Sequence, residues 1–352
     1  MYIFKDLLKK ASELGASDIH ITVGLQPIVR VHGKLVPIGT EKLTTDDTES
    51  LAREILNENQ WEKFNELGEL DFSYSIEGIG RYRVNVFKQR GSVALAIRLV
   101  GLSMPTIESL GLPSVLKELC NKQRGLVLVT GPTGSGKSTT LAAMINEINK
   151  TRTCHVITLE DPVEYMHRHG KSIVNQREVG QDTLSYANAL RAALREDPDV
   201  ILVGEMRDLE TISIAVTAAE TGHLVLSTLH TIGASKTIDR IVDVFPPYQQ
   251  QQIKVQLAGV LEGVISQQLI PMENGNGRAA ALEIMISTPA IRNLIREGKT
   301  HQIDSHIQTG GKYGMKTMDM SLTALYKAGM ISYEDAVNFS VDRDIISRLL
   351  NQ

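Results

Sequence analysis

One eight-residue segment constrains the fold of this chain more than any other. Residues 131–138 read Gly-Pro-Thr-Gly-Ser-Gly-Lys-Ser and stand between an apolar run at 125–130 and good helix formers at 141–144. Glycines allow positive φ and let successive backbone N–H groups converge. A strand, such a loop and a helix, in this order, are typical of a phosphate-binding loop that uses backbone amides and a helix N-terminus.

The residue types in this loop predict a nucleotide site. Lys137 is expected to place its charge on the β and γ phosphates, and Ser138 to offer its hydroxyl to Mg²⁺. The residues expected to bind ATP are Gly131, Pro132, Thr133, Gly134, Ser135, Gly136, Lys137, Ser138 and Thr139.

A carboxylate at the end of a second apolar run predicts hydrolysis. The segment 197–205 reads Asp-Pro-Asp-Val-Ile-Leu-Val-Gly-Glu, which is a buried strand that ends near Glu205. We expect Glu205 to orient the attacking water and partly deprotonate it. The alternative is that Glu205 only precedes a helix whose N-cap is Asp208.

Three further carboxylates follow the apolar run at 155–159, namely Glu160, Asp161 and Glu164. Such a cluster can hold Mg²⁺ partly through water, for which we favour Glu160 and Asp161, or orient the nucleophile, for which we favour Glu164. The alternative is a solvated turn started by Asp161-Pro162.

Two histidines flank the apolar run at 224–226. His230 follows the strand, where a sensor of the γ-phosphate is expected, and His223 precedes it. For His230 we favour a functional role over a structural hydrogen bond, whereas for His223 both remain open.

A guanidinium group commonly stabilises the charge of a phosphoryl transition state. Arg81 and Arg83 are two residues apart and therefore share one face of a strand. For each arginine alone, a solvated surface position is the alternative. The candidates are Arg81, Arg83, Arg90 and Arg98 in the first hundred residues, and Arg195 and Arg207 further on, of which we favour Arg81, Arg83 and Arg98.

Length and patterning predict two domains in the 352 residues. Residues 1–100 are expected to form a small α+β domain, 101–113 a linker, and 114–352 a domain with a mainly parallel sheet. A helix is expected over 45–64. Beyond Pro246 we expect helices, apart from one strand at 279–286.

Composition argues against several classes of partner. A net charge of −4 and an aromatic content of 5% lack the basic and aromatic surplus of nucleic-acid-binding proteins. Cys120 and Cys154 have no metal-ligand spacing, and free thiols are typical of a reducing compartment. No apolar run is long enough to span a bilayer, so no direct membrane insertion is expected.

Together these motifs resemble the secretion-type AAA-like ATPases, and among them the type IV pilus retraction (twitching motility) ATPases. The resemblance extends over almost the whole chain. It rests on the loop at 131–138, the acidic segment 159–165, the segment 201–208, the histidine segment 222–231 and, more weakly, on 15–20, 174–179 and 192–199.

One segment is similar to a signature of the retraction members, Ala290-Ile-Arg-Asn-Leu-Ile-Arg-Glu-Gly-Lys299. The residue pattern predicts a helix capped by Thr288 and ended by Gly298. An apolar stripe is expected to pack, and a basic face to point elsewhere. The stripe consists of Ile291, Leu294 and Ile295, and the other face of Arg292, Asn293 and Arg296.

The resemblance implies an α/β fold with a RecA-like P-loop core and a smaller α+β, PAS-like N-terminal domain. It implies a homohexameric motor in the cytoplasm that uses ATP and Mg²⁺ and works at the inner face of the cytoplasmic membrane. Its partner is expected to be an inner-membrane pilus platform protein, and no nucleic acid is expected. The alternatives are a pilus-extension or type II secretion ATPase, a RecA-type nucleic-acid motor, and a nucleotide-gated scaffold without catalysis.

Overall fold

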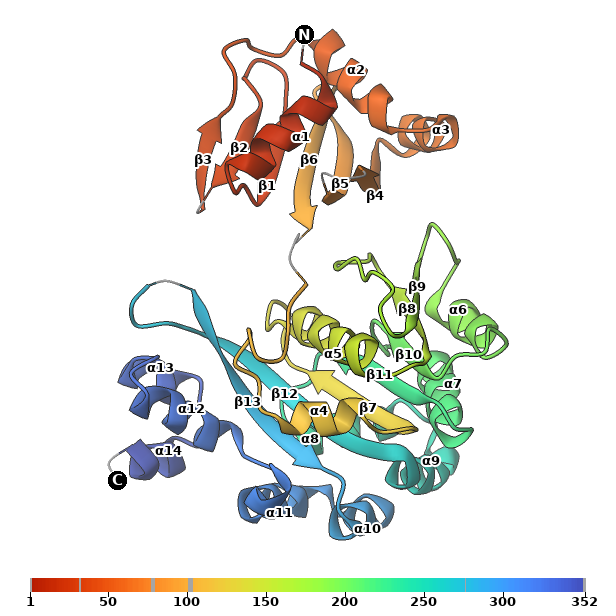
Figure 1. Cartoon of the computed structure of the whole chain (residues 1–352), viewed down its shortest axis with the longest axis vertical. Helices are drawn as coiled ribbons and strands as arrows, with labels where there is room; N and C mark the ends of the chain where they lie inside the picture. The colour runs from red at the N-terminus through yellow and green to blue at the C-terminus, as the bar shows by residue number, and fades with distance from the viewer. Residues whose placement is uncertain (1, 32, 77–79, 101–103, 276, 351–352) are drawn as a thin grey trace. The chain divides into compact units, whose positions relative to one another are not determined.

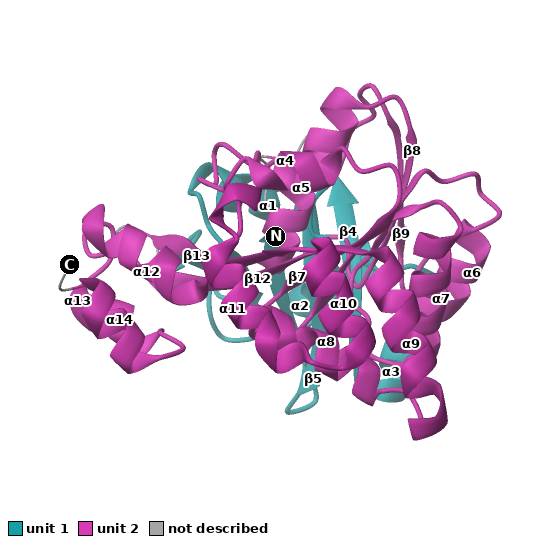
Figure 2. Cartoon of the chain, turned by 90° about the horizontal axis from the view of Figure 1, so that it is seen from below, with its two compact units in different colours: residues 1–103, 164–166 teal, residues 104–163, 167–352 magenta. Residues whose placement is uncertain are grey.

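The chain divides into two compact units. The computed structural model describes residues 2–31, 33–76, 80–100, 104–275 and 277–350. Unit 1 comprises Met1–Ser103 and Glu164–Met166, and unit 2 comprises Met104–Val163 and His167–Gln352 (Figure 2). Of the expected linker over 101–113, residues 101–103 lie outside the described part of the chain. The remainder packs into unit 2, where Ile107 and Leu112 are buried.

Unit 1 is an antiparallel sheet with helices on one face. Its strand order is β3-β2-β1-β6-β5-β4. Tyr82, Val84 and Val86 are buried against the helices, whereas Arg81 and Arg83, which alternate with them along β5, lie on the other face. The elements are α1 Phe4–Glu13, β1 Asp18–Ile21, β2 Ile28–Val31, β3 Lys34–Pro37, α2 Thr45–Ile55, α3 Glu58–Leu67, β4 Glu69–Ile76, β5 Gly80–Gln89 and β6 Ser92–Val100.

Two helices replace the single helix expected over 45–64. The Thr44 side chain accepts a hydrogen bond from the Asp47 amide and caps α2. At the break, the Asn57 side chain accepts from the Gln60 amide and starts α3 as a second capping box. An Asn that bonds to its own backbone competes with helix continuation, so the chain turns there.

Unit 2 is built on a seven-stranded sheet, in the order β13-β12-β7-β11-β10-β8-β9 (Figure 1). All neighbours are parallel except the β12–β13 pair. The strands are β7 Gly125–Thr130, β8 His155–Glu160, β9 Ile173–Glu178, β10 Val200–Val203, β11 Leu224–Leu229, β12 Leu261–Pro271 and β13 Arg278–Ile286. The helices are α4 Val115–Cys120, α5 Lys137–Thr151, α6 Tyr186–Ala193, α7 Leu209–Glu220, α8 Ala234–Asp243, α9 Pro247–Val260, α10 Pro289–Glu297, α11 Ile303–Thr309, α12 Met318–Lys327, α13 Tyr333–Asn338 and α14 Arg343–Leu350.

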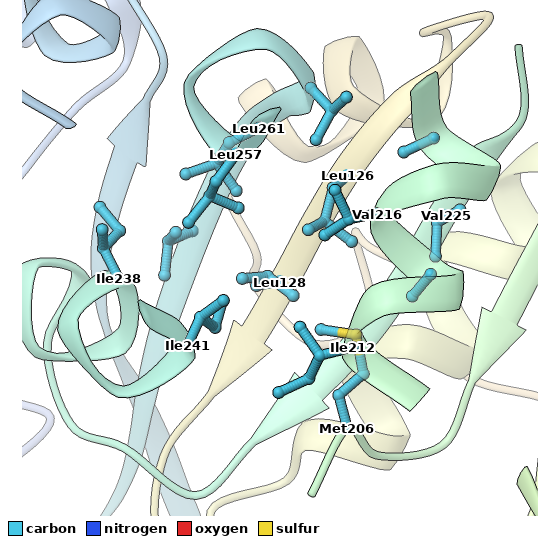
Figure 3. Close-up of a cluster of buried hydrophobic side chains, with 14 of the residues drawn as sticks. Leu126, Leu128, Met206, Ile212, Val216, Val225, Ile238, Ile241, Leu257 and Leu261 are labelled. Carbon is cyan, nitrogen blue, oxygen red and sulfur yellow. The ribbon is translucent and has the colours of Figure 1, made fainter. Parts of the chain in front are cut away.

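Helices cover both faces of this sheet. Leu126 and Leu128 point into a core shared with α7, α8 and α9 (Figure 3). Val127 and Val129 point the other way, into a core shared with α4 and α5. Successive side chains of a strand alternate between faces, so burial on both faces demands the continuous apolar runs seen in the sequence. The expected parallel sheet is confirmed.

The expectation of helix beyond Pro246 is wrong for 261–271, which form β12. Polar residues interrupt the apolar pattern of this strand, and Ser266 and Gln267 are nevertheless buried. Their side chains make hydrogen bonds to residues distant in the sequence, which no local pattern reveals. The strand β9 was also not predicted, whereas β13 at Arg278–Ile286 matches the expected strand.

No helix within the described ranges is both long and apolar enough to cross a membrane.

Candidate active site

The carboxyl edge of the parallel strands collects most of the predicted site residues. The loop 131–136 follows β7, His230 follows β11, Glu205 follows β10, and Glu160 ends β8. These four strands are consecutive neighbours in the sheet. Neighbouring strands lie about 4.8 Å apart, so the edge brings these groups into one row. Ligands of open α/β sheets bind at this edge.

The loop has the backbone shape that phosphate binding needs. Gly131 and Gly136 have φ values of 141° and 87°, and α5 begins at Lys137. Lys137 is buried, and its Nζ donates to the carbonyl oxygens of Gly131 and Pro132 at 2.9 and 3.0 Å. An ammonium group folded over a glycine loop at a helix N-terminus fits a phosphate chain, which offers stronger acceptors than neutral carbonyls. The Ser138 side chain belongs to an exposed residue in the first turn of α5.

The glycines of the loop are also required by close packing. A Cβ on Gly131 would lie 2.2 Å from the carbonyl oxygen of Gln267, and one on Gly136 would lie 2.8 Å from the Gln267 amide nitrogen. Gln267 belongs to β12, which pairs with β7 up to Ser266 and Thr130. The sequence interpretation missed this residue, because nothing local connects it with the loop.

Glu205 lies just beyond β10, in an extension of the chain that β11 holds in place. The Thr228 hydroxyl donates to the carbonyl of Gly204 at 2.6 Å, and the Met206 amide donates to the carbonyl of Thr228 at 3.2 Å. The Glu205 side chain is 16% exposed and forms an ion pair with Arg207. Asp208 caps α7 as predicted, so Glu205 stands outside the helix.

His230 lies within hydrogen-bonding distance of Glu205. Its Nε2 is 3.2 Å from Glu205 Oε2, and an ionised carboxylate can only accept, which makes Nε2 the donor. His223 instead places Nδ1 2.9 Å from the carbonyl of Ala218, at the amino end of β11. The structure thus joins His230 to the predicted catalytic carboxylate and gives His223 a structural contact at the opposite edge.

The acidic segment after β8 is divided. Glu160 accepts hydrogen bonds through Oε1 from the Thr158 hydroxyl at 2.6 Å and from the Gln176 amide at 3.0 Å. Asp161 is exposed and follows directly. Glu164 belongs to the segment Glu164–Met166, which is part of unit 1. The catalytic role of Glu164 stays a prediction.

Tyr186 is a second residue of this edge that the sequence did not reveal. A Cβ on Gly204 would lie 2.7 Å from its hydroxyl oxygen, so the phenol packs beside the residue that precedes Glu205. Burial, followed by the negative charges of Asp161, Glu205 and Glu160, raises the pKa of Tyr186. A neutral phenol therefore stands among the carboxylates.

The three favoured arginines lie on the face of the unit 1 sheet that is opposite to its helices. Arg83 on β5 is opposite Arg98 on β6. Arg98 Nε is 3.0 Å from an oxygen of Asp18, and Arg81 donates to the Ser75 hydroxyl at 3.3 Å. Their catalytic role stays a prediction. Arg195, in contrast, precedes β10 and lies at the amino edge of the unit 2 sheet, away from the loop.

The segment 290–299 forms α10 with the predicted caps. The Thr288 hydroxyl accepts from the Ile291 amide, and Gly298 ends the helix. Ile291, Leu294 and Ile295 are buried as expected. The prediction that Arg292 belongs to an outward basic face is wrong. Its side chain is only 23% exposed and donates to the carbonyls of Ala258 and Gly259 and to the Glu262 carboxylate, at 2.7–2.9 Å. Asn293 and Arg296 do point to solvent.

The predicted Mg²⁺ donors are Ser138, Glu160 and Asp161. Within the described part of the chain, no group of three or more His, Cys, Asp or Glu side chains is arranged to hold a metal ion. Mg²⁺ in nucleotide sites is commonly held by one or two protein groups together with phosphates, so this finding leaves the donors Ser138, Glu160 and Asp161 as a prediction.

The fold and the carboxyl edge define a class, the P-loop nucleotide hydrolases with a RecA-like core. Three comparisons with known proteins narrow it. A family model described as type II/IV secretion system protein matches residues 93–329. The type IV pilus retraction ATPase PilT of Pseudomonas aeruginosa is 52% identical over 331 residues, which are 94% of this chain and 96% of that protein. A twitching motility protein of Neisseria gonorrhoeae is 50% identical, over 88% of this chain and 83% of its own length.

A solved structure agrees with these relatives. The crystal structure of the pilus retraction motor PilT with bound ADP matches with a TM-score of 0.93 and 53% identity, over 99% of both chains. The chain belongs to the type II/IV secretion system protein family and, within it, to the pilus retraction ATPases. The resemblance, the fold class and the assignment as a nucleotide-using ATPase are confirmed.

Proposed function

We propose that this chain hydrolyses ATP to power the retraction of type IV pili, which underlies twitching motility. The contact between Glu205 and His230 beside the phosphate loop supports hydrolysis. The 52% identity to a pilus retraction ATPase over 94% of the chain supports retraction as its use.

The residues at the carboxyl edge have distinct roles in this proposal. Lys137 and the loop amides hold the β and γ phosphates, and Glu205 orients the attacking water and accepts its proton. His230 holds the Glu205 carboxylate from one side and reports the γ-phosphate through the same ring. Arg207 neutralises the other carboxylate oxygen before the substrate enters.

Mg²⁺ fits the oxygen donors at this edge. Ser138 supplies a hydroxyl, and Glu160 and Asp161 supply carboxylates that act partly through water. The ion, when bound, neutralises the charge that develops on the phosphate oxygens. The hydrogen bonds from Thr158 and Gln176 fix the orientation of Glu160 for this task.

The assembly follows from the family resemblance. We propose a homohexamer in which residues 1–100 and 114–352 act as two domains joined by 101–113. Arg81, Arg83 and Arg98 bind the transferring phosphoryl group, and Glu164 assists the nucleophile. Loss of the γ-phosphate removes the charge that the arginines bind, and the domains rotate. The motor works in the cytoplasm, at the inner face of the cytoplasmic membrane, on a pilus platform protein.

A complementation experiment tests this function. Cells that lack the native copy receive the wild-type chain, Lys137→Ala, or Lys150→Ala as the matched control, since Lys150 is exposed at the far end of the same helix. We expect labelled pili to retract with the wild type and Lys150→Ala and to remain extended with Lys137→Ala. Retraction with Lys137→Ala contradicts the motor function, and restored pilus growth in place of retraction favours an extension ATPase.

A further inference from the structure

The phosphate loop is held from behind by one side chain of a distant strand. Gln267 lies on β12 and is only 3% exposed. Its amide nitrogen donates to the carbonyl oxygen of Ser135 at 2.7 Å, and its amide oxygen accepts from the Thr140 hydroxyl at 2.7 Å. One carboxamide therefore ties the middle of the loop to the first turn of α5.

The contact with Ser135 determines the direction of a backbone amide. The carbonyl of Ser135 and the N–H of Gly136 belong to one planar trans peptide, in which the two groups point in opposite directions. Because the carbonyl points at Gln267, the N–H of Gly136 points away from β12. In a phosphate loop this N–H is one of those that bind the phosphate oxygens.

The second contact keeps the carboxamide itself in one orientation. A carboxamide that only donates to Ser135 can turn about its terminal torsion, which is broad for glutamine. The Thr140 hydroxyl fixes the oxygen side, and the nitrogen is then directed at the loop. The loop also packs directly against Gln267, since a Cβ on Gly136 would lie 2.8 Å from the nitrogen of the carboxamide.

The front and the back of the loop differ in what a nucleotide changes. Lys137 donates to Gly131 O and Pro132 O at the front, and these bonds are exchanged for bonds to phosphate when a nucleotide binds. The hydrogen bonds of Gln267 lie on the other side of the Ser135–Gly136 peptide, so a bound nucleotide does not compete for them. They hold the loop in its binding shape beforehand, which lowers the entropic cost of binding.

We propose that Gln267 is a positioning residue of the nucleotide site, which pre-orients the Gly136 amide for phosphate and so sets the affinity for nucleotide more than the rate of hydrolysis. This inference rests on the proposed use of the loop to bind ATP. The wild-type protein tests that use separately, because its failure to bind ADP would contradict the function itself.

The test replaces Gln267 by Met, which has a similar size and makes neither hydrogen bond. We expect the Kd for ADP and the KM for ATP to rise about tenfold, with kcat at saturation within about twofold of wild type. The matched control is Gln268→Met, because Gln268 is the next residue of β12, points to the other face and bonds to Phe339 O instead. It should leave both constants unchanged.

Two further measurements separate positioning from a general loss of structure. In hydrogen exchange without nucleotide, peptides covering 131–136 should exchange faster in Gln267→Met, while those of β13 stay protected and saturating ADP restores the loop. Thr140→Val should raise the Kd for ADP less, and its effect should not add to that of Gln267→Met. Wild-type affinity in Gln267→Met, a loss of kcat with unchanged KM, or faster exchange throughout the β12–β13 pair each overturns the proposal.

Discussion

Two regions at opposite edges of the seven-stranded sheet, the cluster around Glu262 and the phosphate loop, use charge in opposite ways. At the amino edge, Lys122 and Arg292 each bond to a different oxygen of Glu262, at 2.9 and 2.7 Å. Arg292 also donates hydrogen bonds to the carbonyls of Ala258 and Gly259, near the end of α9. At the carboxyl edge, Lys137 donates to neutral carbonyls, and Ser138 and Asp161 are exposed.

The difference distinguishes a cluster that joins structural elements from a loop that binds a ligand. Charges that neutralise one another at close range, as around Glu262, fix α9, α10 and β12 together and leave little for a ligand to gain. Groups that are oriented yet held by weaker partners, as in the phosphate loop, keep their strongest interaction for the substrate. Substitutions should therefore impair catalysis at one edge and stability at the other.

The largest effect is expected from Glu205→Gln. The amide cannot accept the proton of the attacking water, so kcat should fall about 100-fold or more while the Kd for ATP changes little. Steady-state ATPase rates and equilibrium binding measure the two. Glu210→Gln removes an exposed carboxylate that pairs with Arg191 on the same side of the sheet, and its rate should equal that of the wild type. Normal turnover in Glu205→Gln would refute its assignment.

At the amino edge, Arg292→Leu should lower stability and leave the KM for ATP unchanged. The change leaves the carbonyls that end α9 without their donor and Glu262 with Lys122 alone, and should cost about 2 kcal/mol, because the pair is mostly buried. Thermal melting measures the loss. Arg296→Leu, on the exposed side of the same helix, should stay within about 0.5 kcal/mol of wild type. Equal melting temperatures for both variants would contradict a stabilising role of Arg292.

The smallest expected effect is a loss of stability at acidic pH. Burial lowers the pKa of His167 to about 4, whereas an unfolded histidine titrates near 6.5. Between these values the unfolded chain binds the additional proton, so stability decreases as the pH falls from about 6.5 towards 4. At pH about 5.5 the loss should be about 1 kcal/mol.

His167→Phe should remove this part of the acid sensitivity, measured by melting at pH about 7 and about 5.5. The His167 amide donates to Gln176, which also bonds to Glu160, so the sensitivity belongs to the carboxyl edge. The exposed His301 provides the control, and His301→Asn should melt like the wild type at both pH values. An unchanged pH dependence in His167→Phe would show that other groups cause the acid effect.

The sequence predicted the parts of the site whose determinants are local. The loop, Glu205 and His230 each follow an apolar run, and parallel strands bring such positions to one edge whatever their separation along the chain. Thr288 and Gly298 predicted the ends of α10 for the same reason, since caps act within one turn.

Residues could not be predicted where their partners lie on elements that only the order of the strands brings close. Gln267 touches the loop only because β12 lies next to β7, and a polar residue inside an interrupted apolar run gives no sign of this. Arg292 borders the apolar stripe of α10, but the carbonyls and Glu262 that receive it belong to α9 and β12. The break between α2 and α3 was missed because Asn57 could either continue a helix or cap a new one, and its side chain caps α3.

The strand β12 also limits how this protein can change during evolution. Glu262 at its start bonds to Arg292, and Gln267 further along bonds to the loop. The register between β12 and β7 already shifts once, between Leu261 and Gly263. Inserting or deleting one residue beyond that point and before Gln267 would turn Gln267 and every later side chain to the opposite face, so substitutions are better tolerated there than changes of length. Changes of length are better tolerated in the turn that follows Pro271. Homologues of this chain should therefore differ in length after β12 and keep the spacing within it constant.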